Sequence, residues 1–358
     1  MRPTLRARRA RLDPAVRGAR EVVGMYGDPD TTWGICLEAH VDAPVAADDV
    51  ADRVAALCAR HAHLGHAPEV LVVAADGWPA ARRQVASAPY GPSSPLVRLA
   101  LTDDGTRLLV GAHHGVIDGL GLLAVAGGAL GRGLRTRARG IGDRAAPYGF
   151  LGSSVRRLGE ALTDPPARFA GDGDAGSPVE DLSSVTRPRV ERGTAHLARA
   201  VLSTHAEGRW RRTGRRPVLV IGASRRTDDL PQPDRQTAYL RLRVGTGVDV
   251  ESLAPAIAQL RPEPDFPETS AGGTAPLAVR LLSSRLGATA MLSNLGLVSG
   301  DGLLSVTMFP ASSGPRSVAV GLASTSVTTT LSLRTRRRDF GVEEHAALVQ
   351  ALSDRFFA

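Results

Sequence analysis

Two adjacent histidines, His113 and His114, are followed at fixed offsets by Asp118 and Gly119 in the stretch HHGVIDG. Neutral imidazole is the side chain whose unperturbed pKa lies near neutrality, so it can take a proton from a hydroxyl or an amine at working pH. The spacing is more informative than either histidine alone and indicates a proton-transfer site. The alternative is a pair of structural histidines at a turn.

The segments around these histidines predict how they are positioned. The apolar residues that lead into His113 are typical of the end of a buried strand, and the run from Gly119 onward has helical spacing. Segments 96–102 and 106–110, which flank an Asp-Asp-Gly turn, predict a hairpin whose second strand delivers the histidines. We therefore expect His113 and His114 at a corner between a strand and a helix.

The stretch HHGVIDG resembles the HHxxxDG signature of the chloramphenicol-acetyltransferase-like superfamily. This superfamily includes nonribosomal-peptide condensation domains, polyketide-associated acyltransferases, wax-ester synthases and plant acyl-CoA acyltransferases. The resemblance implies that His114 is the catalytic base, and that His113 and Asp118 mainly hold the loop. Gly119 completes the pattern and leaves room for the backbone to turn beside a substrate.

Two further phrases extend the resemblance. ARHAHLG, at residues 59–65, is similar to the RHxxLR phrase that ends the first long helix of condensation domains, with Gly65 in place of the final arginine. The apolar run 217–223 is followed by Ser-Arg-Arg, where the superfamily carries an arginine that pairs with the aspartate of the motif. The match is Arg225, with Arg226 as the alternative, and the ion pair would lock the shape of the corner.

A third phrase lies near the C-terminal end. ATAMLSNLGLV resembles the family's SNxG phrase on a strand that crosses between the two halves, so Ser293, Asn294 and Gly296 are carried over with mainly structural roles. Ser293 and Asn294 are also candidates for stabilising an oxyanion. The family's Gly-Asn before the preceding strand is replaced here by Gln236-Thr237.

The predicted fold is of the α/β class, built as α+β two-layer sandwiches, with two chloramphenicol-acetyltransferase-like subdomains and a channel between them. The chain of 358 residues is long enough for two such units. The N-terminal subdomain is expected at 1–140 and the C-terminal subdomain at 194–358, with a crossover strand at 288–298. The Gly- and Pro-rich segment 141–193 is expected to connect them and to be loosest at 164–179. A strand is predicted at 195–202 and helices at 13–25, 248–261 and 274–286.

The formal charge of +8 comes entirely from arginine, because the chain contains no lysine. This composition suggests a GC-rich, actinobacterial genome. The excess charge indicates a solvated basic surface or sites for the phosphates of coenzyme A or an acidic carrier protein. Few aromatic residues and the lack of a nucleic-acid-binding motif argue against nucleic acid.

Other residues exclude further classes of protein. Cys36 and Cys58 lie in apolar patterns and predict reduced core cysteines of a cytoplasmic protein. The sequence contains no apolar run of the roughly 20 residues that a membrane helix needs. The histidines at 61, 63 and 66 have no carboxylate or cysteine at ligand spacing, so no metal site is expected and a zinc hydrolase is disfavoured. We expect a monomer.

The resemblance implies an acyltransferase that moves an acyl group from a coenzyme A or carrier-protein thioester to a hydroxyl or amine, in specialised-metabolite or lipid biosynthesis. Acyl-CoA or acyl-phosphopantetheine is then a substrate, and no separate cofactor is expected. Two alternatives keep the same fold. One performs cyclisation or dehydration, and the other is a non-catalytic module that docks a carrier protein.

Overall fold

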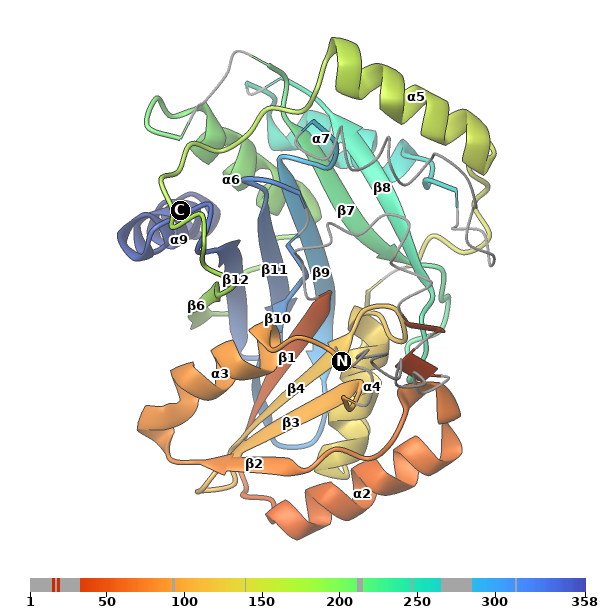
Figure 1. Ribbon diagram of the computed structural model, residues 1–358, viewed down its shortest axis with the longest axis vertical. Coiled ribbons are helices and arrows are strands. Elements are labelled where there is room, and N and C mark those ends of the chain that lie inside the picture. Colours follow the sequence, from red (N-terminus) through yellow and green to blue (C-terminus); the bar gives the residue numbers. More distant parts are fainter. Residues whose placement is uncertain are drawn as a thin grey trace, which may run out of the picture.

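The computed structural model describes residues 15, 16, 18, 19 and 33–358, apart from 92–93, 139, 211–214, 246, 265–284 and 313. Most of the helix predicted at 13–25 and nearly all of the helix predicted at 274–286 lie outside the described residues. The described chain forms two β-sheets with helices around them (Figure 1). This is the mixed α/β architecture expected from the sequence.

The N-terminal half is built on a five-stranded sheet in the order β10-β1-β4-β3-β2. Only the β2–β3 pair is parallel. Its strands are β1 (Gly34–Val41), β2 (Val70–Val73), β3 (Val97–Thr102), β4 (Arg107–His113) and β10 (Leu303–Phe309). The last of these comes from the C-terminal part of the chain, so the two halves share a sheet.

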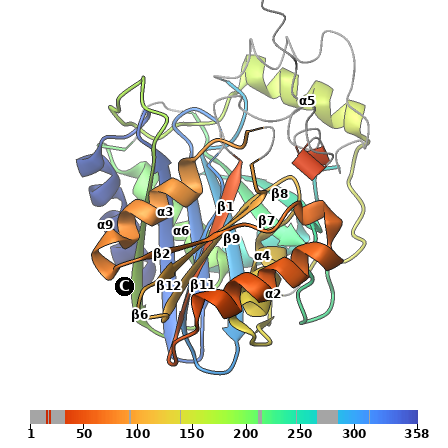
Figure 2. The same ribbon diagram turned by 60° about the horizontal axis from the view of Figure 1, so that its bottom comes forward.

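Alternation along β1 divides the helices between the two faces of this sheet. Ile35 and Leu37 belong to the core formed with α2 (Ala47–Arg60) and α4 (Gly119–Leu130), whereas Cys36 packs with α3 (Trp78–Ser87) on the opposite face. Figure 2 shows α2 and α3 along the N-terminal strands. Both faces are therefore covered, and β4 is held rigidly where it delivers the histidines.

The C-terminal sheet has the order β6-β12-β11-β9-β7-β8, with β5 (Arg135–Thr136) paired to β9. Its other strands are β6 (Glu180–Pro188), β7 (Val218–Ser224), β8 (Thr237–Arg243), β9 (Ala290–Ser299), β11 (Val318–Ser324) and β12 (Thr328–Arg336). One face buries an apolar core with α6 (Thr194–Ala206), α7 (Val250–Gln259) and α9 (Val342–Phe357). The opposite face is left for contact with the N-terminal half.

Small residues allow that second face to approach β10 closely. A Cβ atom on Gly321 would overlap the backbone oxygen of Met308, and Ser332 Oγ donates a hydrogen bond to the same oxygen. The strand expected to cross between the halves corresponds to β9. Its Leu292 packs in the C-terminal core, while Leu295 and Val298 pack in the N-terminal core. Beside β10, the seam between the halves is thus formed by backbone and short side chains.

Two expectations for the middle of the chain are wrong. The segment 195–202 is helical, as part of α6, because Leu197 and Val201 lie one turn apart on the buried face. The segment 164–179 is not loose throughout, since residues 165–169 are buried. Phe169 packs in the C-terminal core and the Arg168 guanidinium bonds backbone carbonyls before β9.

The rest of the connecting region contains α5 (Phe150–Thr163), which lies at the periphery in Figure 2. The short 3₁₀ turns Ala62–Leu64 and Ala75–Gly77 complete the described helical elements. Gly65, which replaces the family's arginine, has φ +77°, a conformation that glycine adopts without strain. Within the described residues, every helix is too short or too polar to cross a membrane.

Candidate active site

His114 lies at the corner predicted from the sequence, just after β4 ends at His113 and before α4 begins at Gly119. Its backbone N–H donates to the carbonyl of Trp33, 2.7 Å away, and its ring Nδ1 lies 2.9 Å from the carbonyl oxygen of Ile117. A carbonyl oxygen can only accept, so Nδ1 carries the hydrogen and Nε2 carries the lone pair. This is the tautomer that a general base acting through Nε2 requires.

The lone pair of Nε2 faces Tyr239, a residue of β8 in the C-terminal half. The Tyr239 hydroxyl oxygen lies 2.9 Å from Nε2, and the two rings meet edge to face. Because Nε2 has no hydrogen in this tautomer, the hydroxyl is the donor. The two halves of the molecule therefore meet at Nε2 of His114.

Burial keeps both partners in their neutral forms. His114 is half-buried, and this burial lowers its pKa from the usual 6.5, against opposing effects of the Ile117 carbonyl and the Asp118 charge. Nearby Arg235 lowers it further. Burial raises the pKa of Tyr239 to about 12. At neutral pH the imidazole can accept a proton and the phenol keeps its own.

His113 is almost fully buried, with 4% of its surface exposed. Its Nδ1 accepts a hydrogen bond from the backbone N–H of Gly115, at 3.0 Å, and its ring meets that of Tyr90 edge to face. These contacts fix the backbone on either side of His114. The arrangement fits the supporting role that the sequence resemblance implies.

Asp118 stabilises the corner through both of its carboxylate oxygens. It is the N-cap of α4, and its Oδ1 accepts from the backbone N–H of Gly121 at 2.7 Å. Its Oδ2 accepts from the backbone N–H of Gln236 at 2.8 Å. Arg226 Nη1 donates to Oδ1 at 3.2 Å, and both side chains are at least 96% buried. The carboxylate thus ties the helix start to the C-terminal half.

The partner of Asp118 is Arg226, so the first match, Arg225, is wrong and the alternative is right. Side chains alternate across a strand, and Ile221 and Ala223 of β7 face the C-terminal core. Continuing that alternation sends residue 226 toward the N-terminal half. Arg225 Nη1 instead lies 3.4 Å from the carbonyl oxygen of Arg144.

Two glycines of the corner allow close packing. A Cβ atom on Gly119 would lie 3.3 Å from Met308 Cε and 3.4 Å from Leu295 Cδ2, so the start of α4 is enclosed by apolar side chains of β10 and β9. A Cβ atom on Gly115 would overlap the backbone of Ala19. The corner is therefore packed on several sides.

The SNxG residues hold β9 and do not contact the His114 ring through any hydrogen bond described here. Asn294 Nδ2 donates to Thr194 Oγ1 at 3.2 Å, while its Oδ1 accepts from the backbone N–H of Gly296. Gly296 has φ +70°, and a Cβ atom there would lie 2.9 Å from the backbone nitrogen of Ala138. Ser293 lies in register with Gly222 and Gly321 of the neighbouring strands. These contacts support the structural role inferred for all three.

Sequence reasoning missed Tyr239 and Trp33. Tyr239 could have been found from alternation, because Ala238, Leu240 and Leu242 are buried and therefore leave residue 239 on the opposite face of β8. Trp33 has φ +55°, an uncommon conformation for a side chain of this size. No local pattern predicts that conformation, which places its carbonyl against the N–H of His114.

Among the described residues, no group of three His, Cys, Asp or Glu side chains could hold a metal ion. The rings of His61 and His63 meet edge to face, and His63 Nε2 lies 2.7 Å from the carbonyl oxygen of Pro233. His63 therefore connects the turn after α2 to the loop that carries Asp234. Cys36 and Cys58 are buried free thiols.

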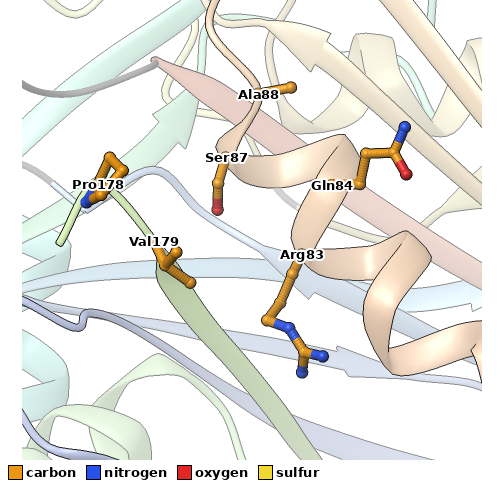
Figure 3. A pocket seen from close by; sticks show the side chains of 6 residues that line it. All are labelled: Arg83, Gln84, Ser87, Ala88, Pro178 and Val179. Atoms are coloured by element: carbon orange, nitrogen blue, oxygen red, sulfur yellow. The ribbon is translucent and has the colours of Figure 1, made fainter.

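Neither of the two cavities described here is lined by His114. One, of about 310 Å³, lies between the end of α3 and the segment that enters β6, with Pro178 and Val179 facing Ser87 and Arg83 (Figure 3). The other, of about 360 Å³, lies among α6, α7 and α9. The channel expected past His114 stays a prediction.

Comparison of the fold with solved structures identifies its class. The chain matches the TRI3 trichothecene 15-O-acetyltransferase from Fusarium sporotrichioides with a TM-score of 0.58 and 12% identity, over 95% of this chain and 93% of that chain. It matches a mutant starter condensation domain of rhizomide synthetase RzmA, in complex with C8-CoA and Leu-SNAC, with a TM-score of 0.56 and 15% identity, over 97% and 93%. The condensation domain of the monacolin K polyketide synthase MokA gives 0.55 and 11%, over 96% of both chains.

No family model matches the sequence, and neither does any curated protein. The structural matches cover nearly the whole of each chain. The protein therefore has the two-subdomain, chloramphenicol-acetyltransferase-like fold of condensation domains and acetyltransferases, as the sequence resemblance implied.

Proposed function

We propose that the protein is an acyltransferase that moves an acyl group from a coenzyme A or carrier-protein thioester to a hydroxyl or amine acceptor, with His114 as the general base. The observation that carries this proposal is the His114 ring itself. Its Nδ1–H is bonded to the Ile117 carbonyl and its Nε2 lone pair is directed away from the loop. A neutral imidazole held in this tautomer can take a proton from an attacking hydroxyl or amine.

The similarity to the RzmA complex with C8-CoA and Leu-SNAC supports a thioester as donor, and the similarity to TRI3 supports a hydroxyl as acceptor. In the proposed reaction His114 Nε2 removes the proton of the acceptor as it attacks the thioester carbonyl. The same proton then passes to the sulfur as it leaves. General base catalysis contributes about 10²–10⁴-fold, and positioning of the two substrates contributes much of the rest.

The remaining residues of the motif support the base. Asp118 lies on the far side of the loop and is paired with Arg226, so it holds the corner and takes no proton. His113 fixes the backbone through Gly115. We expect His114→Ala to lower the rate of acyl transfer far more than His113→Ala does, when each loss of rate is compared with the loss of stability in the same variant.

The test measures release of free thiol from C8-CoA, with hydroxyl and amine acceptors present, and identifies products by mass spectrometry. His114→Ala should lower the rate by about 10²–10⁴-fold while the protein stays folded. His66→Ala, which removes an exposed histidine outside the site, is the matched control. If thiol release and product formation were the same in His114→Ala as in the wild type, His114 would not be the base.

A further inference from the structure

The contact between Tyr239 and His114 raises a chemical problem that the proposed function must solve. The hydroxyl donates to Nε2 at 2.9 Å, and Nε2 of a neutral imidazole has a single lone pair. The hydroxyl or amine of the acceptor must donate to that same lone pair before it can be deprotonated. The Tyr239 hydroxyl therefore lies at the position that the reacting nucleophile must take.

The surroundings of Tyr239 determine what its hydroxyl can do when a nucleophile displaces it. Burial keeps the phenol protonated, so it remains a donor and cannot act as a second base. The charged groups that act on it are Asp118, which is engaged by Arg226, and the exposed Arg235. Tyr239 is half-buried, and its hydroxyl takes another acceptor close by when it loses His114, because leaving the donor unpaired costs free energy.

The reaction places a new hydrogen-bond acceptor near the Tyr239 hydroxyl, namely the carbonyl oxygen of the thioester. The nucleophile lies within hydrogen-bond distance of Nε2, and the carbonyl carbon that it attacks lies one bond farther on. The carbonyl oxygen is then close to the position that the Tyr239 hydroxyl has just left. We infer that Tyr239 donates to Nε2 in the free enzyme and to the carbonyl oxygen in the transition state, and is the residue that stabilises the oxyanion.

This inference rests on the proposed function and completes its reaction. As the bond from the acceptor oxygen or nitrogen to the carbonyl carbon forms, the acceptor proton passes to His114 Nε2. The π electrons move onto the carbonyl oxygen, which accepts the hydrogen bond of Tyr239. When that oxygen re-forms its double bond, the carbon–sulfur bond breaks, and the sulfur takes its electron pair and the proton of His114. The phenol keeps its proton throughout.

The decisive variant is Tyr239→Phe, which retains the ring and removes the hydroxyl. Loss of one oxyanion donor should lower kcat for C8-CoA by about 10²–10³-fold. The KM for C8-CoA should change by less than about threefold, because the interaction is made only in the transition state. Tyr148→Phe, at an exposed tyrosine beside α5, is the matched control and should behave as the wild type.

A second measurement does not require turnover. A trifluoromethyl ketone analogue of acyl-CoA becomes tetrahedral when hydrated, whereas the matching methyl ketone stays planar. The wild type should bind the fluorinated analogue more tightly by calorimetry, and Tyr239→Phe should lose that preference. A wild type without the preference would overturn the inference, even if the variant failed to fold.

The outcomes separate this inference from the proposed function. If Tyr239→Phe kept its kcat or gained kcat/KM, the hydroxyl would merely block the base, and the inference would be wrong. If His114→Ala abolished transfer while Tyr239→Phe retained it, the inference alone would fail. If His114→Ala had no effect, or the wild type transferred no acyl group, the proposed function would fail and the inference with it.

Discussion

Two buried arginines of the C-terminal half reach the N-terminal half on either side of the histidine corner, and they do so in different ways. Arg226 pairs directly with Asp118, a carboxylate of the other half. Arg334 of β12 pairs with Glu180 of the adjacent strand β6, in its own half. Its guanidinium then donates to two backbone carbonyls across the seam, at 2.5 Å to Gly34 and 3.2 Å to Ala86.

The difference determines what each pair controls. Gly34 begins β1 and is paired in register with His113 of β4, so Arg334 holds the end of β1 that lies beside the histidines. Asp118 caps α4 and bonds Gln236, so Arg226 holds the other end of the corner. The Glu180–Arg334 ion pair lies within the C-terminal half, whereas the Asp118–Arg226 ion pair itself joins the two halves. We therefore expect the first to affect stability most and the second to affect activity most.

The largest loss of stability is expected for Arg334→Met. Glu180 is 3% exposed, and its carboxylate would be buried without its guanidinium, which costs about 3–5 kcal/mol of unfolding free energy. Urea denaturation measures the change. The double variant Glu180→Leu with Arg334→Met should recover part of the loss, because no charge stays buried. Arg135→Met, which breaks an exposed pair with Asp229, is the control. Equal stability of Arg334→Met and this control would contradict the role of Arg334.

A smaller loss of stability but a large loss of rate is expected for Asp118→Asn. The amide oxygen can still cap α4, but only Asp234 of the two carboxylates paired with Arg226 keeps its charge, and the amide N–H₂ faces other donors. We expect a cost of about 2–3 kcal/mol. A shift of the corner that displaces His114 should lower thioester turnover by about 10²-fold. Asp229→Asn, at an exposed carboxylate, is the control. Lost stability with full activity would show that the pair does not position His114.

The assignment of Arg226 can be sharpened with two lysine variants. Arg226 also donates from Nη2 to the backbone oxygens of Gln232 and Asp234, at 3.0 and 3.2 Å. Lysine keeps the charge but cannot span these acceptors, so Arg226→Lys should cost about 1–2 kcal/mol. Arg225→Lys should cost clearly less. The reverse order in urea denaturation would restore Arg225 as the functional arginine.

The two arginine pairs also show what could be predicted from the sequence. Local patterns predicted the hairpin of β3 and β4, the start of α4 and the helix α7, and the short motif predicted the corner because its residues lie next to one another in the chain. Arg225 and Arg226 both follow the end of β7, and only the side to which each side chain projects separated them. The Glu180–Arg334 pair joins residues 154 positions apart, and neither belongs to a motif. No periodicity predicts which two strands become neighbours.

The errors elsewhere have a similar cause. The short apolar run 195–202 fits a strand or a helix equally well by pattern alone, and packing against the C-terminal sheet decides for a helix. The Gly- and Pro-rich composition of 164–179 suggested a loose connection. Phe169 is nevertheless buried in the C-terminal core, because long-range packing overrides local composition.

The smallest effects concern pH, and they distinguish the two regions through one histidine in each, the half-buried His114 and the buried His345. Beside the Glu180–Arg334 pair, His345 Nδ1 lies 2.7 Å from Thr335 Oγ1 and its Nε2 lies 2.9 Å from Ser183 Oγ. Burial lowers the pKa of both His114 and His345 from 6.5. Below pH 6.5 the unfolded chain binds protons that the folded protein does not, so stability present above pH 6.5 is lost as pH falls through the folded pKa values.

The two histidines should report on different quantities. Protonation of His114 removes the base, so kcat/KM should fall on the acid side, with its midpoint below pH 6.5 because the pKa is lowered. Protonation of His345 disturbs β6 and β12, so His345→Gln should reduce the loss of unfolding free energy between pH 7 and pH 5 without moving the kcat/KM profile. An acid limb centred above pH 6.5 would contradict the burial of His114. If His345→Gln shifted the pH profile of kcat/KM, the region around Arg334 would influence His114 as strongly as the region around Arg226 does.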